Sequence, residues 1–184
     1  MIQARIREAQ ESDTDAVREL VFKAFGPGEG PKIAQLISDL LFDPSAVPNL
    51  SLVATIDRTV VGYVLFTHAE VRRPGRVVAA AILAPLAVHP AVQSKGIGGQ
   101  LITTGLEGMA HRRTELVFVL GHPGYYPLYG FQPAGALGFE APYPIPIEHA
   151  NAWMVQALQP DIIGAVSGTV SCAAALRDPQ YWRE

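Results

Sequence analysis

The sequence predicts an α/β protein, because segments with strand-like patterns alternate with segments of helical periodicity. Residues 77–88 form an apolar run of twelve residues, which suits a buried strand and is too short to span a membrane. Apolar residues recur at helical spacing between residues 16 and 24 and again after residue 95. Short polar turns separate further apolar runs, so strands and helices share one chain.

Length and composition fit one globular domain. The chain has 184 residues, of which 49% are hydrophobic and 17% are charged, and a chain of this size can bury a core. We expect a single domain with a core at about residues 1–135 and a variable part at about residues 136–184. The net charge of −3 argues against a broad nucleic-acid-binding surface.

The compartment is expected to be the cytoplasm. The single cysteine, Cys172, rules out an internal disulfide and fits a reducing environment. Arg5, Arg7 and Glu8 stand where a signal peptide would need its apolar core. No membrane partner is therefore expected.

The first part of the chain predicts a strand and two helices. Residues 2–7 alternate apolar and polar side chains, as in a short strand. Ser12 and Asp15 resemble a capping box at the start of the first helix, which a Gly-Pro-Gly sequence at residues 26–28 ends. The second helix is expected from near Pro31, because proline is favoured at the first helical position.

The middle of the chain predicts two hairpins. Strands at residues 50–56 and 60–67 are joined by a tight turn at Asp57 and Arg58. A second turn at residues 72–76 leads into the apolar strand at residues 77–88. The three arginines of this second turn could contact an acidic partner or could simply be solvated.

The later elements are shorter. We expect a helix at about residues 95–111, a buried strand at residues 116–120, and a short helical turn closed by glycine at residues 125–131. Residues 152–158 could form about two helical turns, and residues 168–173 could form one more strand.

Residues 86–99 connect the apolar strand to the longer helix and read Leu-Ala-Val-His-Pro-Ala-Val-Gln-Ser-Lys-Gly-Ile-Gly-Gly. A helix that begins on glycine-rich backbone presents unpaired N–H groups at the positive end of its dipole. Such a helix start binds anions, and phosphates in particular. The glycine spacing fits neither the dinucleotide fingerprint nor the P-loop, and a simple tight turn is the alternative interpretation.

Three landmarks together resemble the GNAT superfamily of N-acyltransferases. They are the Leu-Ala-Val-His-Pro strand, the Gln-x-x-Gly-x-Gly loop at residues 93–98, and a Tyr-x-x-x-Gly-Phe sequence at residues 126–131. The Gly-His-Pro-Gly-Tyr-Tyr-Pro sequence also resembles one bacterial subgroup of small acetyltransferases. The resemblance covers about residues 1–135 and implies a GNAT-type fold, with a central mixed, mostly antiparallel sheet that is splayed at the acetyl-CoA site and flanked by helices.

The same resemblance implies acetyl-CoA as co-substrate. Leu86, Ala87 and Val88 would offer backbone groups to the pantetheine arm, and one of their N–H groups would polarise the thioester carbonyl. The pyrophosphate would lie on the following loop and helix start, which comprise Gln93, Ser94, Lys95, Gly96, Ile97, Gly98 and Gly99. No metal is expected in this site.

Tyr126 aligns with the tyrosine that usually donates a proton to the departing thiolate of GNAT enzymes. A phenol with a pKa near 10 is a weak acid, yet it can share a proton with a thiolate in the transition state. The alternative is that the ring of Tyr126 only packs under the preceding strand. Tyr125 and Tyr129 lie within one helical turn of it and are weaker candidates.

The general base is not evident from the pattern. Many relatives carry a glutamate in the strand before the Leu-Ala-Val segment, whereas residues 79–82 here read Ala-Ala-Ala-Ile. His122 is the best remaining candidate because the ordinary pKa of imidazole is close to 7. His68 and Glu70 are alternatives, and a chain of water molecules could also remove the proton.

The leading hypothesis is an acetyl-CoA-dependent N-acetyltransferase that transfers the acetyl group directly to a primary amine. The acceptor could be a small molecule or a protein or peptide amine, and the protein could act as a monomer or as a homodimer. A catalytically idle acyl-CoA-binding or regulatory module is the alternative. A third hypothesis, acetylation of aminoacyl-tRNA, is disfavoured by the acidic charge balance.

Overall fold

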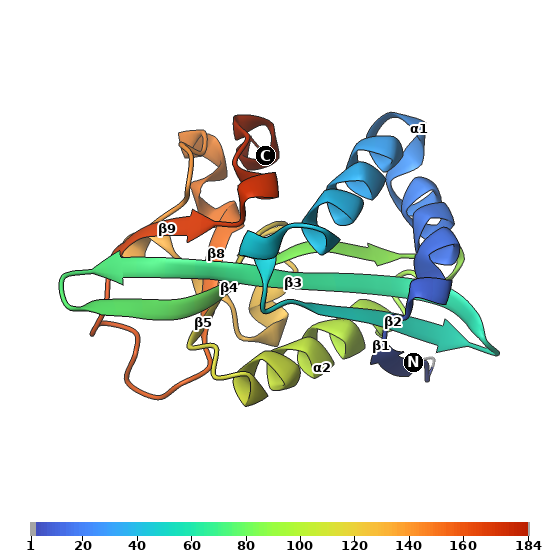
Figure 1. Ribbon diagram of the computed structural model, residues 1–184, viewed down its shortest axis with the longest axis horizontal. Helices are drawn as coiled ribbons and strands as arrows, with labels where there is room; N and C mark the ends of the chain where they lie inside the picture. Colours follow the sequence, from blue (N-terminus) through green and yellow to red (C-terminus); the bar gives the residue numbers. More distant parts are fainter. Residues whose placement is uncertain (1–2, 184) are drawn as a thin grey trace.

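A mixed sheet forms the centre of the molecule in the computed structural model, which describes residues 3–183 (Figure 1). Within these residues the strand order along the main path is β1-β2-β3-β4-β5-β8-β6, and β9 pairs with β3 and β7. The β4–β5 and β7–β9 pairs are parallel and the other pairs are antiparallel. The expected mixed, mostly antiparallel sheet is therefore confirmed.

The strands are β1 (Arg5–Glu8), β2 (Leu50–Ile56), β3 (Thr59–Arg73), β4 (Arg76–Val88), β5 (Leu116–Leu120), β6 (Gln132–Pro133), β7 (Phe139–Glu140), β8 (Trp153–Ala157) and β9 (Gly168–Cys172). The α-helices are α1 (Thr14–Leu41) and α2 (Ile97–His111). Short 3-10 helices are η1 (Glu11–Asp13), η2 (Pro44–Ala46), η3 (Pro90–Val92), η4 (Tyr126–Tyr129), η5 (Gly135–Leu137), η6 (Ile147–Ala152), η7 (Ala174–Leu176) and η8 (Pro179–Trp182).

The two α-helices cover opposite faces of the sheet (Figure 1). Helix α2 lies on one face, where Gly105 stands so close to the ring of Phe66 that a Cβ at this position would overlap it. Helix α1 and the C-terminal segment lie on the other face. Each face has its own buried apolar cluster, so the sheet is covered on both sides and the core lies in two layers.

Helix α1 consists of two helices that meet at Gly26. Its φ of 81° and ψ of 176° lie outside the helical region, and glycine adopts such a conformation at least cost. The predicted break at residues 26–28 is confirmed, but the second helix resumes directly after Gly26. The predicted start near Pro31 is therefore wrong by about one turn, and Pro31 lies inside the helix.

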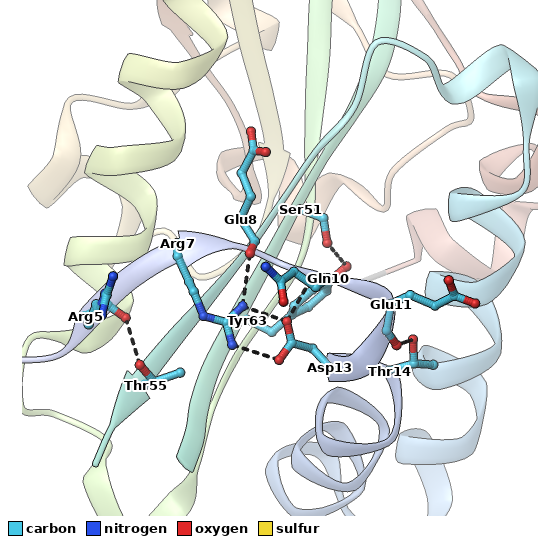
Figure 2. Close-up of polar contacts among 10 residues, drawn as sticks. All are labelled: Arg5, Arg7, Glu8, Gln10, Glu11, Asp13, Thr14, Ser51, Thr55 and Tyr63. Atoms are coloured by element: carbon cyan, nitrogen blue, oxygen red, sulfur yellow. Dashed lines mark hydrogen bonds and ion pairs between the residues drawn. The ribbon is translucent and has the colours of Figure 1, made fainter. Parts of the chain in front are cut away.

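The start of α1 is fixed by Asp13, and not by the predicted capping box of Ser12 and Asp15. The Asp13 carboxylate accepts two hydrogen bonds from the Arg7 guanidinium, at 2.7 and 2.9 Å, and one from the backbone N–H of Gln10 at 2.7 Å (Figure 2). The hydrogen bond from Arg7 lowers the pKa of Asp13 to about 2. This bidentate ion pair ties β1 to the end of η1, directly before α1.

The predicted hairpins are confirmed. Asp57 and Arg58 form the turn between β2 and β3 with φ values of 49° and 67°, as a two-residue hairpin turn requires. The second turn lies between β3 and β4, and these long strands pair from Gly62↔Val88 to Arg73↔Arg76.

The prediction of helical turns at residues 152–158 is wrong, because this segment is strand β8. It pairs with β5 on one side and with β6 on the other. Trp153 and Val155 pack into the cluster under α1, whereas Met154 packs into the cluster under α2. A strand buried on both faces loses the alternation of apolar and polar residues, so its pattern resembles a short buried helix.

Strand β9 confirms the strand predicted at residues 168–173, and α2 and β5 confirm the helix and strand predicted near residues 95–111 and 116–120. Both β8 and β9 belong to the central sheet. Among residues 3–183, no helix is both long and apolar enough to cross a membrane.

Candidate active site

The parallel strands β4 and β5 separate along their length and form a V. Their ladder contains the pairs Ala80↔Leu116, Ala81↔Val117 and Ile82↔Phe118 in the described chain, and it stops there. Beyond this point β4 pairs with β3 on its other edge, and β5 pairs with β8. The inner edge of β4 after Ile82 therefore has no β5 partner in the described residues.

A β-bulge in β4 lies at the point where the strands part. The β3–β4 register passes from Phe66↔Leu83 to Val64↔Leu86, so β4 contains one residue more than β3 between these pairs. A bulge bends its strand and increases the local twist. Pro85 lies within the bulge and has no backbone N–H to donate to a ladder. The local sequence therefore favours the divergence of β4 from β5.

Glu115 holds the closed end of the V. Its backbone N–H donates to the carbonyl of Ala79 at 2.8 Å, and its carboxylate accepts a hydrogen bond from the Ala79 N–H at 3.1 Å. The same carboxylate forms an ion pair with Arg76. The two strands are thus joined by both backbone and side-chain contacts before their three-pair ladder begins.

The β4 arm leads through a compact loop into α2. The side-chain amide of Gln93 donates to the carbonyl of Val88 at 3.0 Å, and Nδ1 of His89 accepts from the N–H of Ala91 at 3.1 Å. Ser94 and Gly96 have φ values of 62° and 90°, and Gly96 is the N-cap residue of α2. Left-handed residues before a helix start form an anion-binding concavity with the first N–H groups of the helix.

The sequence-predicted cofactor residues lie together on this arm. Leu86, Ala87 and Val88 occupy the part of β4 that has left β5, and residues 93–99 run from its loop into the first turn of α2. The residues present therefore suit an extended thioester arm beside β4 and a pyrophosphate at the helix start. The side chain of Gln93 closes this loop onto Val88.

The β5 arm ends in a second loop that has the same His-Pro start. Nδ1 of the exposed His122 accepts a hydrogen bond from the N–H of Gly124 at 3.0 Å, as His89 does from Ala91 in the first loop. An imidazole nitrogen that accepts this bond is unprotonated, so the neutral ring carries its proton on Nε2. His122 would have to give up the Gly124 bond before Nδ1 could accept a proton.

Tyr126 begins η4 at the end of the β5 arm and is 8% exposed. Its ring covers Gly121 so closely that a Cβ on Gly121 would have no room, and it meets Phe131 edge-to-face at 5.7 Å. Gly130 closes η4 in the left-handed conformation, as the sequence predicted. Packing of the Tyr126 ring and a role for its hydroxyl are therefore compatible.

Tyr125 and Tyr129 connect the two arms, a contact that the sequence analysis did not foresee. Their hydroxyl groups lie against Gly98 and Gly99 in the first turn of α2. Burial, and then the hydrogen bond with Tyr129, raise the pKa of Tyr125 well above the ordinary phenol value. A higher pKa makes Tyr125 a poorer proton donor than an ordinary tyrosine.

The alternative base candidates lie on the closed side of the V. His68 and Glu70 are in β3. They lie opposite Ala81 and Ala79 of β4, before the β4–β5 ladder ends. Nε2 of His68 lies 3.1 Å from the Glu70 carboxylate, which also pairs with Arg72 at 2.8 Å. The hydrogen bond with His68 lowers the pKa of Glu70, which makes its carboxylate a weaker base.

Potential metal ligands do not gather in this region. Among residues 3–183, no group of three or more His, Cys, Asp or Glu side chains could hold a metal ion.

Comparison with known proteins assigns this geometry to a family. The sequence model described as Acetyltransferase (GNAT) domain matches residues 5–134. The uncharacterized N-acetyltransferase YjhQ of Escherichia coli is 45% identical over 163 residues, which cover 88% of each chain. The family-model match spans both arms of the V and strand β3, which flanks β4.

Two solved structures share the fold over nearly their whole length. The N-acetyltransferase YhbS of Escherichia coli, crystallised with CoA, has a TM-score of 0.84 and 28% identity, covering 97% of this chain and 94% of its own. A GNAT-family acetyltransferase of Brucella melitensis, crystallised with acetyl-CoA, has a TM-score of 0.72 and 27% identity, covering 94% and 97%.

Proposed function

This chain belongs to the GNAT acetyltransferase family, and on that premise we propose that it transfers the acetyl group of acetyl-CoA directly to a primary amine. The observation that carries the proposal is the parting of β4 and β5 beside the start of α2. It leaves β4 backbone groups available next to an anion-binding helix start. The CoA and acetyl-CoA complexes of the two structural relatives support the same co-substrate.

The β4 arm would bind the co-substrate. Leu86, Ala87 and Val88 would pair with the pantetheine arm through their backbone groups, as a further strand does in a sheet. The N–H groups of the loop and of the first turn of α2 would hold the pyrophosphate, and the exposed Lys95 would add positive charge. Binding would therefore depend on backbone geometry more than on side chains.

The acetyl transfer itself requires a polarised carbonyl, a neutral amine and a proton for the departing sulfur. Acetyl-CoA supplies the activated thioester. A β4 N–H would stabilise the negative charge that develops on the carbonyl oxygen. The hydroxyl of Tyr126 would donate its proton to the thiolate, and the raised pKa of Tyr125 makes that neighbour the poorer candidate.

Two routes could deprotonate the amine. His122 is at the open end of the V, whereas His68 and Glu70 lie at its closed end, so position favours His122 as the side-chain base. Its Nδ1 already accepts the Gly124 N–H, and this favours the second route, through water. We keep His122 as the candidate and test it by the pH dependence described below.

A catalytically idle acyl-CoA-binding module is the alternative function. The observation that favours it is the run of alanines at residues 79–81, which places no carboxylate on β4 before the strands part. Such a module would bind acetyl-CoA through the same β4 arm but would not turn it over. Acetyl transfer that depends on Tyr126 distinguishes the enzyme from the module.

The test has two steps. Calorimetry with acetyl-CoA measures binding, and a thiol assay then follows CoA release with a panel of small polyamines, amino acids and peptide N-termini. We expect binding, and release with at least one amine that is lost in Tyr126→Phe. Binding without release for any amine would support the idle module, and absence of binding would contradict both functions.

A further inference from the structure

The open end of the V is held together by side chains, because the β4–β5 ladder stops after three pairs. On the β4 arm, Gly98 and Gly99 lie in the first turn of α2. On the β5 arm, η4 and the residue before it present Tyr125 and Tyr129. These two tyrosines contact these two glycines, so side-chain contacts join the two arms at the open end.

The hydroxyl of Tyr125 lies directly over the bare Cα of Gly98. A Cβ on Gly98 would approach this oxygen more closely than real atoms do, whereas the ring carbon Cζ of Tyr125 would be 3.5 Å away. The same Cβ would lie 3.7 Å from Cγ2 of Val88, at the end of β4. A methyl group at Gly98 therefore conflicts with one atom, the Tyr125 oxygen, and makes ordinary contacts with the others.

Tyr125 also packs against Tyr126. The two residues are adjacent in the chain, and their rings meet edge-to-face at 5.2 Å. Tyr125 meets Tyr129 in the same way at 5.3 Å, so the three rings form one packed unit at the end of the β5 arm. Displacement of Tyr125 would be transmitted to Tyr126, because close-packed rings cannot move independently.

We propose that Tyr125 is a positioning residue whose hydroxyl, packed on the Cα of Gly98, fixes the separation between the cofactor-binding arm and the turn that carries Tyr126. This inference rests on the proposed function, in which α2 holds the cofactor and Tyr126 donates the proton. Gly98 is then a glycine because Tyr125 requires the space, and its role differs from that of Gly96, whose φ is 90°. A displacement of about 1 Å between reacting groups can lower a rate by about 10²-fold.

The neighbouring pair provides a matched control. A Cβ on Gly99 would lie 2.5 Å from the hydroxyl oxygen of Tyr129, but also 2.6 Å from its Cε1 and 2.8 Å from its Cζ. Removal of the hydroxyl group alone would leave these two ring carbons in conflict with the new methyl group. The geometry thus predicts that Tyr125→Phe relieves the steric conflict created by Gly98→Ala. Tyr129→Phe should not relieve the conflict created by Gly99→Ala.

The experiment is a pair of double-mutant cycles. The first contains Gly98→Ala, Tyr125→Phe and the double variant, and the second contains Gly99→Ala, Tyr129→Phe and their double variant. Calorimetry measures the affinity for CoA, and the thiol assay measures CoA release from acetyl-CoA with an amine or, without one, by hydrolysis. All measurements are made at a temperature where circular dichroism shows every variant to be folded.

We expect Gly98→Ala to weaken CoA binding about tenfold and to lower the rate of CoA release by about 10²-fold. Tyr125→Phe should reduce the affinity and the release rate less, since its ring remains. In the double variant both quantities should lie within about threefold of their values in Tyr125→Phe, because the two sites interact. The cost of Gly99→Ala should persist in its double variant. If Tyr125 had only a structural role, Gly98→Ala would lower the release rate and the affinity to the same extent. The double variants would then also not recover in the Gly98 cycle alone.

If the losses in affinity and release rate are additive in the Gly98 cycle, Tyr125 has no positioning role. The same conclusion follows if Gly98→Ala binds CoA and releases it as the wild type does. Rescue in both cycles would also overturn it, because the relief would then not depend on the single oxygen contact. If the wild-type protein binds no CoA, the proposed function is wrong and the positioning role falls with it. These outcomes are distinguished by the wild-type titration alone.

Discussion

The closed and open ends of the V are held by different kinds of contact. At the closed end, Ala79 exchanges hydrogen bonds with Glu115, and the β4–β5 ladder follows. At the open end, tyrosine side chains of the β5 arm pack on Gly98 and Gly99 of the β4 arm. Side-chain packing leaves the inner β4 backbone without β5 partners, and the proposed chemistry needs those groups. In the proposed function, the hydrogen-bonded end therefore joins the two strands and the open end binds the ligand.

The largest expected effect is on kcat, from a substitution that removes a reactive group at the open end and leaves the packing there intact. Tyr126→Phe keeps the ring against Gly121 and Phe131 but removes the hydroxyl group. Loss of a positioned general acid typically lowers kcat by about 10²- to 10⁴-fold. Affinity for acetyl-CoA, measured by calorimetry, should change less than about threefold because the backbone site is unaltered. An unchanged kcat would show that Tyr126 is not the acid.

The next effect would test whether the backbone of the β4 arm binds the phosphates. Gly96→Asp and Gly96→Asn introduce side chains of similar size, and both residues tolerate the left-handed backbone conformation. The variants differ in charge, and an aspartate carboxylate would repel a pyrophosphate at the helix start. We expect Gly96→Asp to bind acetyl-CoA at least about tenfold more weakly than Gly96→Asn, or about 1.4 kcal/mol.

Calorimetry at low and high salt supplies the control for the Gly96 pair. The difference between the two variants should shrink as salt screens the exposed charge. Equal affinities at low salt would locate the phosphates elsewhere.

A third variant would weaken the closed end alone. Glu115→Ala leaves the N–H of Ala79 without its carboxylate partner and removes the ion pair with Arg76. The free energy of unfolding, measured with urea, should fall by about 1–2 kcal/mol. Glu115→Gln should cost less, since its amide oxygen can still accept the Ala79 N–H. A loss of acetyl-CoA affinity as large as that of Gly96→Asp would show that the two ends are not independent.

The smallest expected effect concerns the base. If the imidazole of His122 removes the proton, kcat/KM should rise with pH, and His122→Ala should flatten that rise. Because Nδ1 already accepts from Gly124, we expect instead that the curve follows the pKa of the acceptor amine. The measurement compares wild type and His122→Ala on two amines of different basicity.

His89→Ala is the matched control, since it loses the same type of turn hydrogen bond in the β4 arm. Each alanine variant should lower stability by about 1 kcal/mol or less. A pH–rate curve that changes in His122→Ala but not in His89→Ala would contradict the water route and identify His122 as the base.

Local signals in the sequence predicted most of the V. The apolar run of β4, the turn at Asp57 and Arg58, and the glycine-rich start of α2 each have a residue pattern with a direct structural cause. The motifs were sufficient to indicate the family, which the comparisons then showed. The proposed roles of Tyr126 and His122 stay predictions, because a motif gives the position of a residue but not its protonation.

Contacts between distant segments could not be predicted in this way. β8 was interpreted as helical because both of its faces are buried, which depends on the sheet around it. The packing of Tyr125 on Gly98 joins a loop residue of the β5 arm to the first turn of α2. The sequence pattern offered no reason to look for this contact, because a glycine in a phosphate-binding pattern already has an apparent explanation. The Asp13–Arg7 ion pair was missed because a polar pattern at a helix start does not show which carboxylate meets a strand.

The pairing of β9 with β3 has a consequence for the solubility of the chain. β3 is longer than its neighbour β2, which covers its edge only as far as Phe66, and β9 covers Ala69, Glu70 and Val71 on that same edge (Figure 1). An uncovered strand edge is a template for pairing with another molecule. Strand β9 thus protects the sheet against aggregation. A truncation before Gly168 would expose the unpaired backbone groups of this part of β3.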